Sequence, residues 1–421
     1  MRILLHSYHR RSKADFRATP LARCLAERGH NVTVMCIADH GRLGIRDHRE
    51  DGVRFVEVPD LFTGKLRSSW DPWDALHRAV CLVRERFDVV HLFETRPAVI
   101  HPSQLNLWLS NAVLVTDWSD WWGRGGLIEH QRPAWYRKLF GGFETYYEER
   151  FRCGAQATTV ISHALKHRAM GLGIPEETIT WIPNGVSVQG VQVVPPQTHR
   201  ARFGLPLDAF ILCDSAHDVT MGIELTFRTV ARLVAHRRRV LFMMTGRGQR
   251  DLEALAARHG VAAHFRHFGF VPQADLSELL SCADVYAIPY IDNLANRGRW
   301  PGRVGNYLPL GRPIVSNPVG EMTGLVRGHG VGVLVDETPQ AMAEAIQRLM
   351  DDPAEAHTLG QRARRLAENE LTWARMTDRL EHAYAGALAR APRPRSGSSC
   401  ASVAAAAIKK ASHRDTLQSC K

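Results

Sequence analysis

The sequence predicts an α/β protein built from two doubly wound parallel sheets. Three observations lead to this prediction. The first 37 residues follow a strand, helix, strand pattern, and similar alternation continues to about residue 185. After a proline-rich stretch, VQVVPPQTHRARFGLP, a second series of strand-like runs begins. These runs are almost continuously apolar, as is typical of strands that helices cover on both faces.

The first unit shows the pattern most clearly. RILLHSY is expected to be a strand, TPLARCLAERGH a helix and NVTVMCI the next strand. Thr19 suits the N-cap of this helix, Pro20 its first position and Gly29 its end. A helical crossover of this kind makes the two strands parallel.

The remaining elements follow in order along the chain. In the first half, helices are expected over residues 72–86 and over WYRKLFGGFETYYEERF, and strands at VRFVEV, DVVHLF, AVLVT, ATTVIS and ITWIPNG. In the second half, strands are expected at AFILCDS, VLFMMTG, HFRHFGF, DVYAIPY, RPIVSN and GVGVLV. Ligands of such sheets bind beyond the carboxyl ends of the strands, so the loops there are the candidate sites.

Domain boundaries follow from these series. We expect an N-terminal domain over residues 1–192 and a C-terminal domain over residues 193–372. A final helix is expected within residues 373–391, and a disordered basic tail over residues 392–421.

Composition indicates a soluble globular protein, with 45% hydrophobic and 23% charged residues. The opening MRILLHSYHRRSK has too short an apolar stretch for a signal peptide, and no run approaches the length of about 18 apolar residues that spans a membrane. A cytoplasmic protein is expected. The eight cysteines show no C-x-x-C spacing, so reduced thiols and no metal site are predicted.

The net charge is +11, and the last thirty residues, with six basic residues and one acidic residue, supply +5 of it. The remaining excess suits anionic small molecules or an anionic membrane surface, which leaves a peripheral membrane association open. No nucleic-acid recognition motif is present, so no nucleic-acid partner is expected.

Five segments in this order resemble the GT-B glycosyltransferases of family 4 (glycosyl transferases group 1). They are LARCLAERGHNVTVM, TVISHALKHRAMGLGIPEETITWIPNGV, MMTGRGQRDLEALAARHG, FGFVPQADLSELLSCADVYAIPY and YLPLGRPIVSNPVGE. The resemblance covers about residues 1–390. It implies two Rossmann-like domains facing across a cleft, a nucleotide-diphosphate sugar held by the second domain, and an acceptor facing the first. It also implies a retaining reaction that needs no metal or other cofactor, and a closing helix that crosses back to the first domain.

Donor binding without a metal requires fixed cations and backbone N–H groups around the leaving diphosphate. The loop RGRWPGR, which follows the strand DVYAIPY, offers guanidinium groups that match phosphate oxygens. We assign Arg297 and Arg303 to the diphosphate; the alternative is that they are solvated loop charges. The resemblance adds these donor-side candidates: Ser162, Asn184, Asn306, Tyr307, Gly320 and Glu321. Glu321 has the alternative of simply favouring a helix dipole.

Two departures from the family pattern favour a second hypothesis. Family members carry two glutamates with seven residues between them, where this chain has Gly298 and Asn306, and a lysine where this chain has Met221. The resemblance implies a hexosyltransferase of cell-surface polysaccharide or glycoconjugate synthesis. The alternative that these departures favour is a catalytically degenerate GT-B protein. Such a protein would bind sugar nucleotides or a partner enzyme without turnover.

Acceptor-side candidates follow strands of the first half. His91, in DVVHLFETRP, resembles a family histidine near the transferred sugar, although a lone histidine is often structural. Asp117 and Asp120, in DWSDWWGRGG, are candidates for accepting the proton of an acceptor hydroxyl or for binding the acceptor, a glycan or a lipid-linked sugar. An Asx turn or helix cap is the alternative.

The same region is rich in aromatic residues, and a helix with three glutamates follows it. Trp118, Trp121, Trp122, Trp135 and Tyr136 stack on sugars or meet a lipid interface if they are exposed, and otherwise form core. In the following helix, Glu144, Glu148 and Glu149 are expected mostly on a solvated face.

Overall fold

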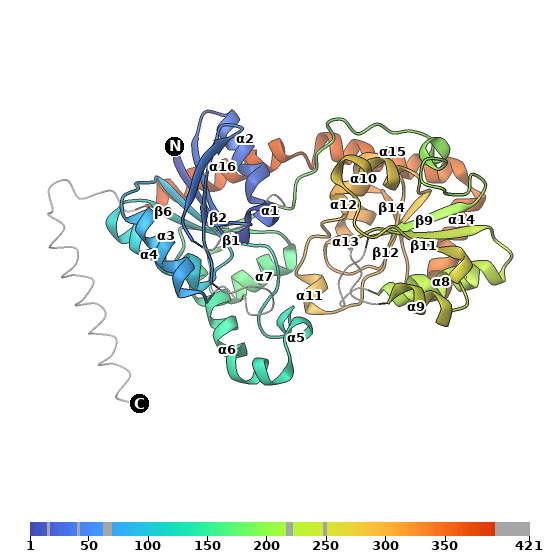
Figure 1. Ribbon diagram of the computed structural model, residues 1–421, viewed down its shortest axis with the longest axis horizontal. Helices are drawn as coiled ribbons and strands as arrows, with labels where there is room; N and C mark the ends of the chain where they lie inside the picture. Colours follow the sequence, from blue (N-terminus) through green and yellow to red (C-terminus); the bar gives the residue numbers. More distant parts are fainter. Residues whose placement is uncertain (15–16, 40–42, 62–69, 216–221, 247–250, 392–421) are drawn as a thin grey trace.

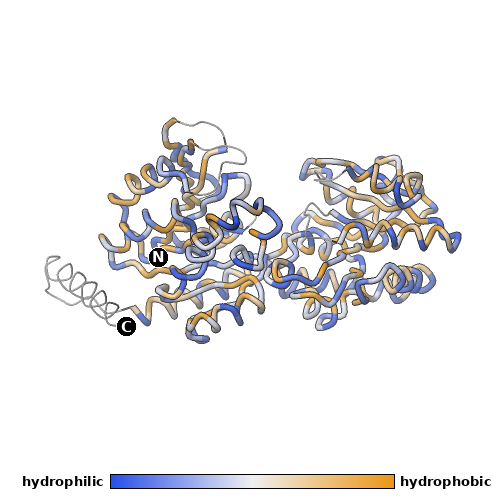
Figure 2. Tube along the Cα trace, turned by 90° about the horizontal axis from the view of Figure 1, so that it is seen from below, coloured by the Kyte–Doolittle hydropathy of each residue, from blue (hydrophilic) through white to orange (hydrophobic). Residues whose placement is uncertain are grey.

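The computed structural model describes residues 1–14, 17–39, 43–61, 70–215, 222–246 and 251–391. The chain forms two α/β lobes, each with a largely parallel sheet between helices, which confirms the predicted fold class (Figure 1). Figure 2 shows the same two lobes from below. Met221 and the predicted tail, residues 392–421, lie outside the described residues.

The first lobe contains an eight-stranded sheet in the order β3-β4-β2-β1-β5-β6-β7-β8. All pairs are parallel except β3 with β4. The strands are β1 (Arg2–Arg10), β2 (Asn31–Ile37), β3 (Arg46–Glu50), β4 (Val53–Val58), β5 (Val89–Phe93), β6 (Val113–Trp118), β7 (Ala157–Val160) and β8 (Ile179–Trp181).

Two elements of this lobe lack the expected sequence signals. Strand β3, RDHRE, is charged because it is an edge strand with mostly exposed side chains, joined to β4 by a tight turn in which Asp51 and Gly52 have positive φ. Helix α4 contains Pro102 in its interior.

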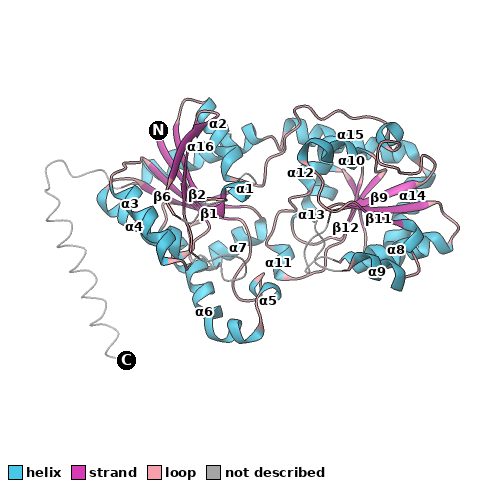
Figure 3. Cartoon of the chain, in the orientation of Figure 1, coloured by secondary structure: helices cyan, strands magenta, loops and turns pink. Residues whose placement is uncertain are grey.

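The helices of the first lobe cover both faces of the sheet (Figure 3). They are α1 (Arg11–Ala14), α2 (Ala18–Glu27), α3 (Pro72–Val83), α4 (Pro97–Leu109), α5 (Ile128–Gln131), α6 (Ala134–Arg150) and α7 (His163–Gly171). The predicted N-cap of α2 is wrong: Arg17 precedes the helix and Thr19 lies buried inside its first turn. Gly29 has a φ of 85° just beyond the end of α2, as expected for a helix terminator.

The second lobe contains a six-stranded parallel sheet in the order β11-β10-β9-β12-β13-β14. The strands are β9 (Phe210–Asp214), β10 (Val240–Met244), β11 (Phe265–His267), β12 (Val285–Ile288), β13 (Ile314–Ser316) and β14 (Gly332–Leu334). The helices are α8 (Ile223–Ala235), α9 (Leu252–Arg258), α10 (Gln273–Ser281), α11 (Leu294–Arg297), α12 (Val304–Tyr307), α13 (Glu321–Thr323), α14 (Pro339–Asp351) and α15 (Pro353–Asn369). Short 3-10 segments are η2 (Arg152–Gly154), η3 (Glu176–Thr178), η4 (Pro196–His199), η5 (Ala262–His264) and η6 (Leu308–Leu310), and η7 (Gly324–Gly328) is a π-helical turn.

The last helix, α16 (Trp373–Arg390), returns from the second lobe and packs on α2 and on strands β6 to β8 of the first. Its Glu381 accepts hydrogen bonds from Arg28 and from His30, and its buried Tyr384 reaches His91 under the sheet. The last described helix is therefore part of the first lobe, although it follows the second lobe in the sequence.

The chain crosses between the lobes twice, and the two crossing segments are joined. The backbone N–H of Val186 donates to the carbonyl of Leu371 at 2.6 Å, and Val186 forms a bridge with Thr372. Gly185 is necessary at this point, because a Cβ there would overlap the ring of Trp373. The two segments form one double-stranded connection.

Candidate functional site

A cavity of about 330 Å3, lined by both polar and apolar residues, lies where the carboxyl ends of the first-lobe strands face the second lobe. Its first-lobe wall comes from the residues at or after the ends of β1, β5 and β6, and from Arg17 at the start of α2. Trp300 and Gly302, from the loop between α11 and α12, complete the wall. The cavity thus lies at the edge of the sheet where ligands of α/β folds bind.

Arg17 and Asp117 form a buried ion pair beneath this cavity. The Arg17 Nε and Nη2 groups donate to the two Asp117 oxygens at 2.9 and 2.8 Å, and Nη1 donates to Asn184 Oδ1 at 3.0 Å. Burial opposes ionisation of Asp117, but Arg17 and a 2.5 Å hydrogen bond from Thr159 outweigh it and hold the pKa of Asp117 below its usual range. Asp117 is therefore a fixed anion that positions Arg17 and does not itself line the cavity.

Asn184 and Asp120 do line the cavity. Asp120 is half-buried in the loop after β6, and Asn184 follows β8 in the first crossing segment. Of the predicted site residues, these two come together in one space although 64 positions separate them in the sequence. The placement keeps Asp120 as a candidate for contact with an acceptor.

Glu94 is a candidate that the sequence reading missed. The residue is 7% exposed, it lines the cavity together with Asp120, and its carboxylate accepts a hydrogen bond from the Ser119 hydroxyl. Burial raises the pKa of Glu94 against the opposing charges of Arg152 and Arg96. Its φ is 73°, a conformation that costs a non-glycine residue free energy. A strained backbone and a perturbed carboxyl at a cavity wall are together typical of a functional residue.

His91 lies outside the cavity, which corrects its assignment as a group that touches the sugar. The side chain is fully buried, with Nδ1 2.8 Å from the Tyr384 hydroxyl and Nε2 3.4 Å from the Thr159 hydroxyl. Residue 91 lies within β5, two positions before its end, so its side chain packs under the sheet against α16. Burial lowers the pKa of His91 from 6.5 to about 4.

This shifted pKa predicts an acid-sensitive fold. The unfolded chain binds a proton at His91 below its ordinary pKa of 6.5 and the folded chain only near 4, so the contribution to stability is complete above 6.5 and is lost as the pH falls through 4. The loss amounts to about 3 kcal/mol. We expect urea unfolding across this range to show a smaller acid slope for His91→Asn than for the unaltered chain. Equal slopes would contradict the assignment of this slope to His91.

On the second-lobe side, Arg303 lies at the carboxyl end of β9. Its side chain is 7% exposed, and the guanidinium is ion-paired with the fully buried Asp214. Tyr307 is also buried, stacks on Tyr286 with ring centroids 3.9 Å apart, and shares a 2.6 Å hydrogen bond with Ser215. Arg303 and Tyr307 thus meet at the strand end that precedes residues 216–221, where ligands of this fold type bind.

Arg297 and Asn306 lie differently from these two. Arg297 has an exposed side chain that Asp292 holds through two 2.6 Å hydrogen bonds, which fits the solvated-charge interpretation, and its assignment to the diphosphate stays a prediction. Asn306 is exposed on α12. The two arginines of one loop therefore have different environments.

Ser162 and Glu321 join the two lobes at the N-terminus of α7, and Gly320 precedes Glu321 in a tight contact within the second lobe. The Ser162 hydroxyl donates to the carbonyl of Gly298 at 2.9 Å, and Glu321 accepts from the backbone N–H of His163 at 2.7 Å. Gly320 has a φ of 53°, and a Cβ there would lie 2.9 Å from the Cα of Arg297. Figure 3 shows α7 and α11 next to each other at this junction. In this conformation Ser162 and Glu321 hold the lobes together.

Gly298, directly after α11, also serves this contact between the lobes. A Cβ at Gly298 would lie 2.5 Å from the Cβ of Trp121, so only glycine lets this loop pack on the first lobe. Trp300 approaches Trp181 across the junction, with ring centroids 6.3 Å apart. The stretch that follows α11 therefore forms the contact between the lobes and one wall of the cavity.

Within the described residues, no group of three or more His, Cys, Asp or Glu side chains is placed to hold a metal ion. The same residues include no helix that is long and apolar enough to cross a membrane.

Comparison with known proteins gives two family matches, one to each lobe. Residues 17–189 match the model Glycosyltransferase Family 4, and residues 210–352 match the model Glycosyl transferases group 1. A D-inositol 3-phosphate glycosyltransferase of Thermobispora bispora is 28% identical over 233 residues, which are 52% of this chain and 53% of the relative. The chain spans about half the length of the curated relatives that it matches.

Solved structures share the architecture over almost the whole chain. The sucrose-phosphate synthase of Thermosynechococcus elongatus superposes with a TM-score of 0.72 at 16% identity, covering 92% of this chain and all of that one (100%). The Anabaena protein HepE in complex with UDP-glucose gives a TM-score of 0.68 at 15% identity, covering 91% of this chain and 100% of that one. With one family match on each lobe and this shared architecture, the chain belongs to the GT-B glycosyltransferases of family 4 (glycosyl transferases group 1).

Proposed function

We propose that this chain is a retaining, metal-independent hexosyltransferase. It moves a hexose from a nucleotide-diphosphate sugar to a glycan or lipid-linked acceptor in the synthesis of a cell-surface polysaccharide or glycoconjugate. One observation carries the proposal: a cavity lined by two carboxyl groups lies where the strand ends of the first lobe meet the loop of the second. The complex of HepE with UDP-glucose supports a nucleotide-sugar donor for this architecture.

The donor occupies the second lobe in this proposal. Arg303, held at the end of β9 by Asp214, faces the developing charge of the leaving diphosphate, and Tyr307 supports the same strand end. An arginine already fixed by an ion pair needs little reorganisation during the reaction, which is the condition for effective electrostatic stabilisation. Arg297 takes no part, because Asp292 holds it on the surface.

The acceptor occupies the cavity of the first lobe. Glu94 and Asp120 orient its hydroxyl groups, and Asp120 accepts the proton of the attacking hydroxyl. The bond between C1 of the hexose and the diphosphate oxygen breaks, and the acceptor oxygen bonds to C1 on the same face of the sugar. Asp117 acts at a distance: it holds Arg17, which forms part of the cavity wall.

Binding without turnover is the second candidate function, and the exposed Asn306 favours it. An amide in place of the glutamate of the family pattern makes only neutral hydrogen bonds to a ribose diol. Release of nucleotide diphosphate from a bound donor distinguishes the two functions, since a protein that only binds the donor releases none in the presence or absence of glycan acceptors.

The donor prediction compares two arginines of one loop. A panel of nucleotide-diphosphate sugars should contain one that raises the melting temperature, because saturation at about 100 times Kd stabilises the folded state by roughly 2.7 kcal/mol. Arg303→Lys keeps the charge beside Asp214 but loses the planar fork, so we expect calorimetry to show a donor Kd about tenfold higher or more.

Arg297→Lys is the matched control for this measurement, since its side chain is exposed and paired outside the site. We expect its donor Kd to equal that of the unaltered chain. Equal donor affinities for Arg303→Lys and Arg297→Lys would remove Arg303 from the donor site.

A further inference from the structure

Helix α6 exposes an apolar stripe on the outside of the first lobe. Trp135, Leu139, Phe143 and Tyr146 are 62%, 63%, 56% and 51% exposed, and their spacing places them along one side of the helix. The helix forms the lower edge of the lobe in Figure 1. Four large apolar side chains in one exposed row are unusual for a surface that only water contacts.

The polar side of the same helix faces inward, which corrects the expectation that its glutamates are solvated. Glu144 is 1% exposed, pairs with Arg96 and accepts hydrogen bonds from Trp122 at 2.6 Å and Tyr136 at 2.8 Å. The amphipathic helix is thus oriented with its carboxylates inside and its aromatic rings outside.

A second glutamate fixes this orientation. Glu148, 4% exposed, accepts hydrogen bonds from the Trp118 indole at 2.9 Å and from the Trp122 backbone at 2.8 Å, and it pairs with Arg168. Rotating α6 to bury the stripe would break the buried charge-assisted hydrogen bonds of Glu144 and Glu148. The outward stripe is therefore a built feature of the lobe.

Basic groups are the exposed charges at the two ends of the stripe. Lys138 and Arg150 are exposed on α6, while Glu144 and Glu148 point inward and Glu149 pairs with Arg168. Exposed aromatic rings flanked by basic groups, with the carboxylates of the helix either buried or ion-paired, complement an anionic interface. A partner surface for this helix is therefore apolar and negatively charged.

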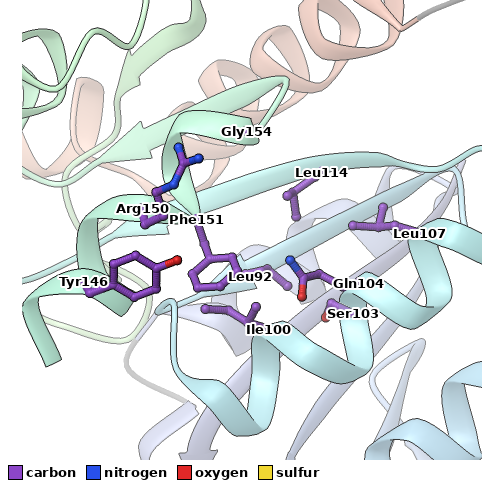
Figure 4. Close-up of a pocket in the computed structure, with 10 residues that line it drawn as sticks. All are labelled: Leu92, Ile100, Ser103, Gln104, Leu107, Leu114, Tyr146, Arg150, Phe151 and Gly154. Carbon is purple, nitrogen blue, oxygen red and sulfur yellow. The ribbon is translucent and has the colours of Figure 1, made fainter. Parts of the chain in front are cut away.

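An apolar cavity of about 480 Å3 adjoins the stripe, between α4 and the end of α6 (Figure 4). Tyr146 belongs to both the stripe and the cavity wall, and Phe151, Leu92 and Ile100 line the cavity beneath it. Arg150 also lines the cavity. An opening with apolar walls next to a guanidinium suits a lipid whose chain is apolar and whose head group is a phosphate.

We propose that α6 docks the protein on the surface of a bilayer that contains anionic phospholipids. Trp135, Leu139, Phe143 and Tyr146 enter the boundary between head groups and acyl chains, and Lys138 and Arg150 meet the lipid phosphates. Docking needs no sugar transfer, so this inference stands or fails independently of the proposed function. A lipid-linked acceptor would be reached from the same surface.

Sedimentation with lipid vesicles tests the docking. The full chain should bind vesicles of phosphatidylcholine with about 30 mol % phosphatidylglycerol, and bind phosphatidylcholine alone more weakly. The double variant Leu139→Ser, Phe143→Ser should have an affinity for the anionic vesicles at least about tenfold lower, because two apolar side chains no longer enter the acyl boundary. Its melting temperature should not change, since both side chains are exposed.

Leu207→Ser is the matched control, because Leu207 is 59% exposed in the second lobe. It should bind vesicles like the unaltered chain. Brominated phospholipids should quench tryptophan fluorescence of the full chain, and the conservative variant Trp135→Phe should reduce that quenching. This second measurement holds even if the serine variant folds poorly.

Three results would overturn the proposal. The first is a full chain that ignores anionic vesicles, and the second is equal vesicle binding by the Leu139→Ser, Phe143→Ser variant. The third is a chain that dimerises in solution through α6, with the dimer lost in that double variant and no vesicle binding.

Discussion

Replacement of Arg17 by methionine should lower the free energy of unfolding by about 3–5 kcal/mol. The change leaves Asp117 buried and ionised without its partner, and it also removes the hydrogen bonds from Arg17 to Asn184 and to the carbonyl of Ile182. A buried charge that loses its partner costs far more than the net contribution of the pair. Urea unfolding of the purified chain measures the loss.

Arg23, on the helix α2 that Arg17 precedes, provides the control. Its side chain is 40% exposed and pairs with Glu50 and Asp51 at the surface, so Arg23→Met should cost less than about 1 kcal/mol. A double change, Arg17→Met with Asp117→Leu, should recover much of the loss because no unpaired charge stays in the lobe. Similar stability of Arg17→Met and Arg23→Met would show that the Arg17 pair is not a structural requirement.

Replacement of Glu94 by glutamine should reduce kcat/KM for transfer about 100-fold or more while donor affinity stays the same. The amide keeps the size of the side chain but loses the charge that holds the acceptor hydroxyls in the proposed complex. Transfer kinetics together with donor calorimetry make the measurement. A parallel loss of donor affinity would instead assign Glu94 to a structural role between the lobes.

The backbone of Glu94 gives this prediction a second readout. Glu94→Gly relieves the cost of a φ of 73°, so it should raise stability by about 1 kcal/mol and still abolish transfer. Asp51, with a φ of 49° in the exposed turn before β4, is the matched position. Asp51→Gly should bring a similar gain in stability and leave transfer unchanged, which separates strain that serves the site from strain in a turn.

The architecture could be predicted because most of its strands and helices have recognisable local sequence patterns. Parallel strands covered on both faces are continuous apolar runs, and the helix signals between them are short-range. The charged edge strand β3 carries no such signal. Pro102 lies inside α4, where a proline in the sequence argues against a helix. Edge pairing and a tolerated helix proline depend on tertiary surroundings, which local patterns do not contain.

The site was only partly predictable, because pairing at long range decides which polar residues are available. Arg297 and Arg303 are equivalent in the sequence, but Asp214, 89 positions away, buries one of them, while Asp292 holds the other on the surface. Asp120 was found because it follows a strand. Glu94 follows a strand equally closely, but nothing in the sequence shows its φ or its burial.

The doubled connection between the lobes limits how the molecule moves. Two chain segments cross side by side and are hydrogen-bonded to each other. This arrangement favours rotation of the lobes about the doubled connection as a hinge. In the proposed function, donor and acceptor would therefore enter and leave by the margin opposite this connection.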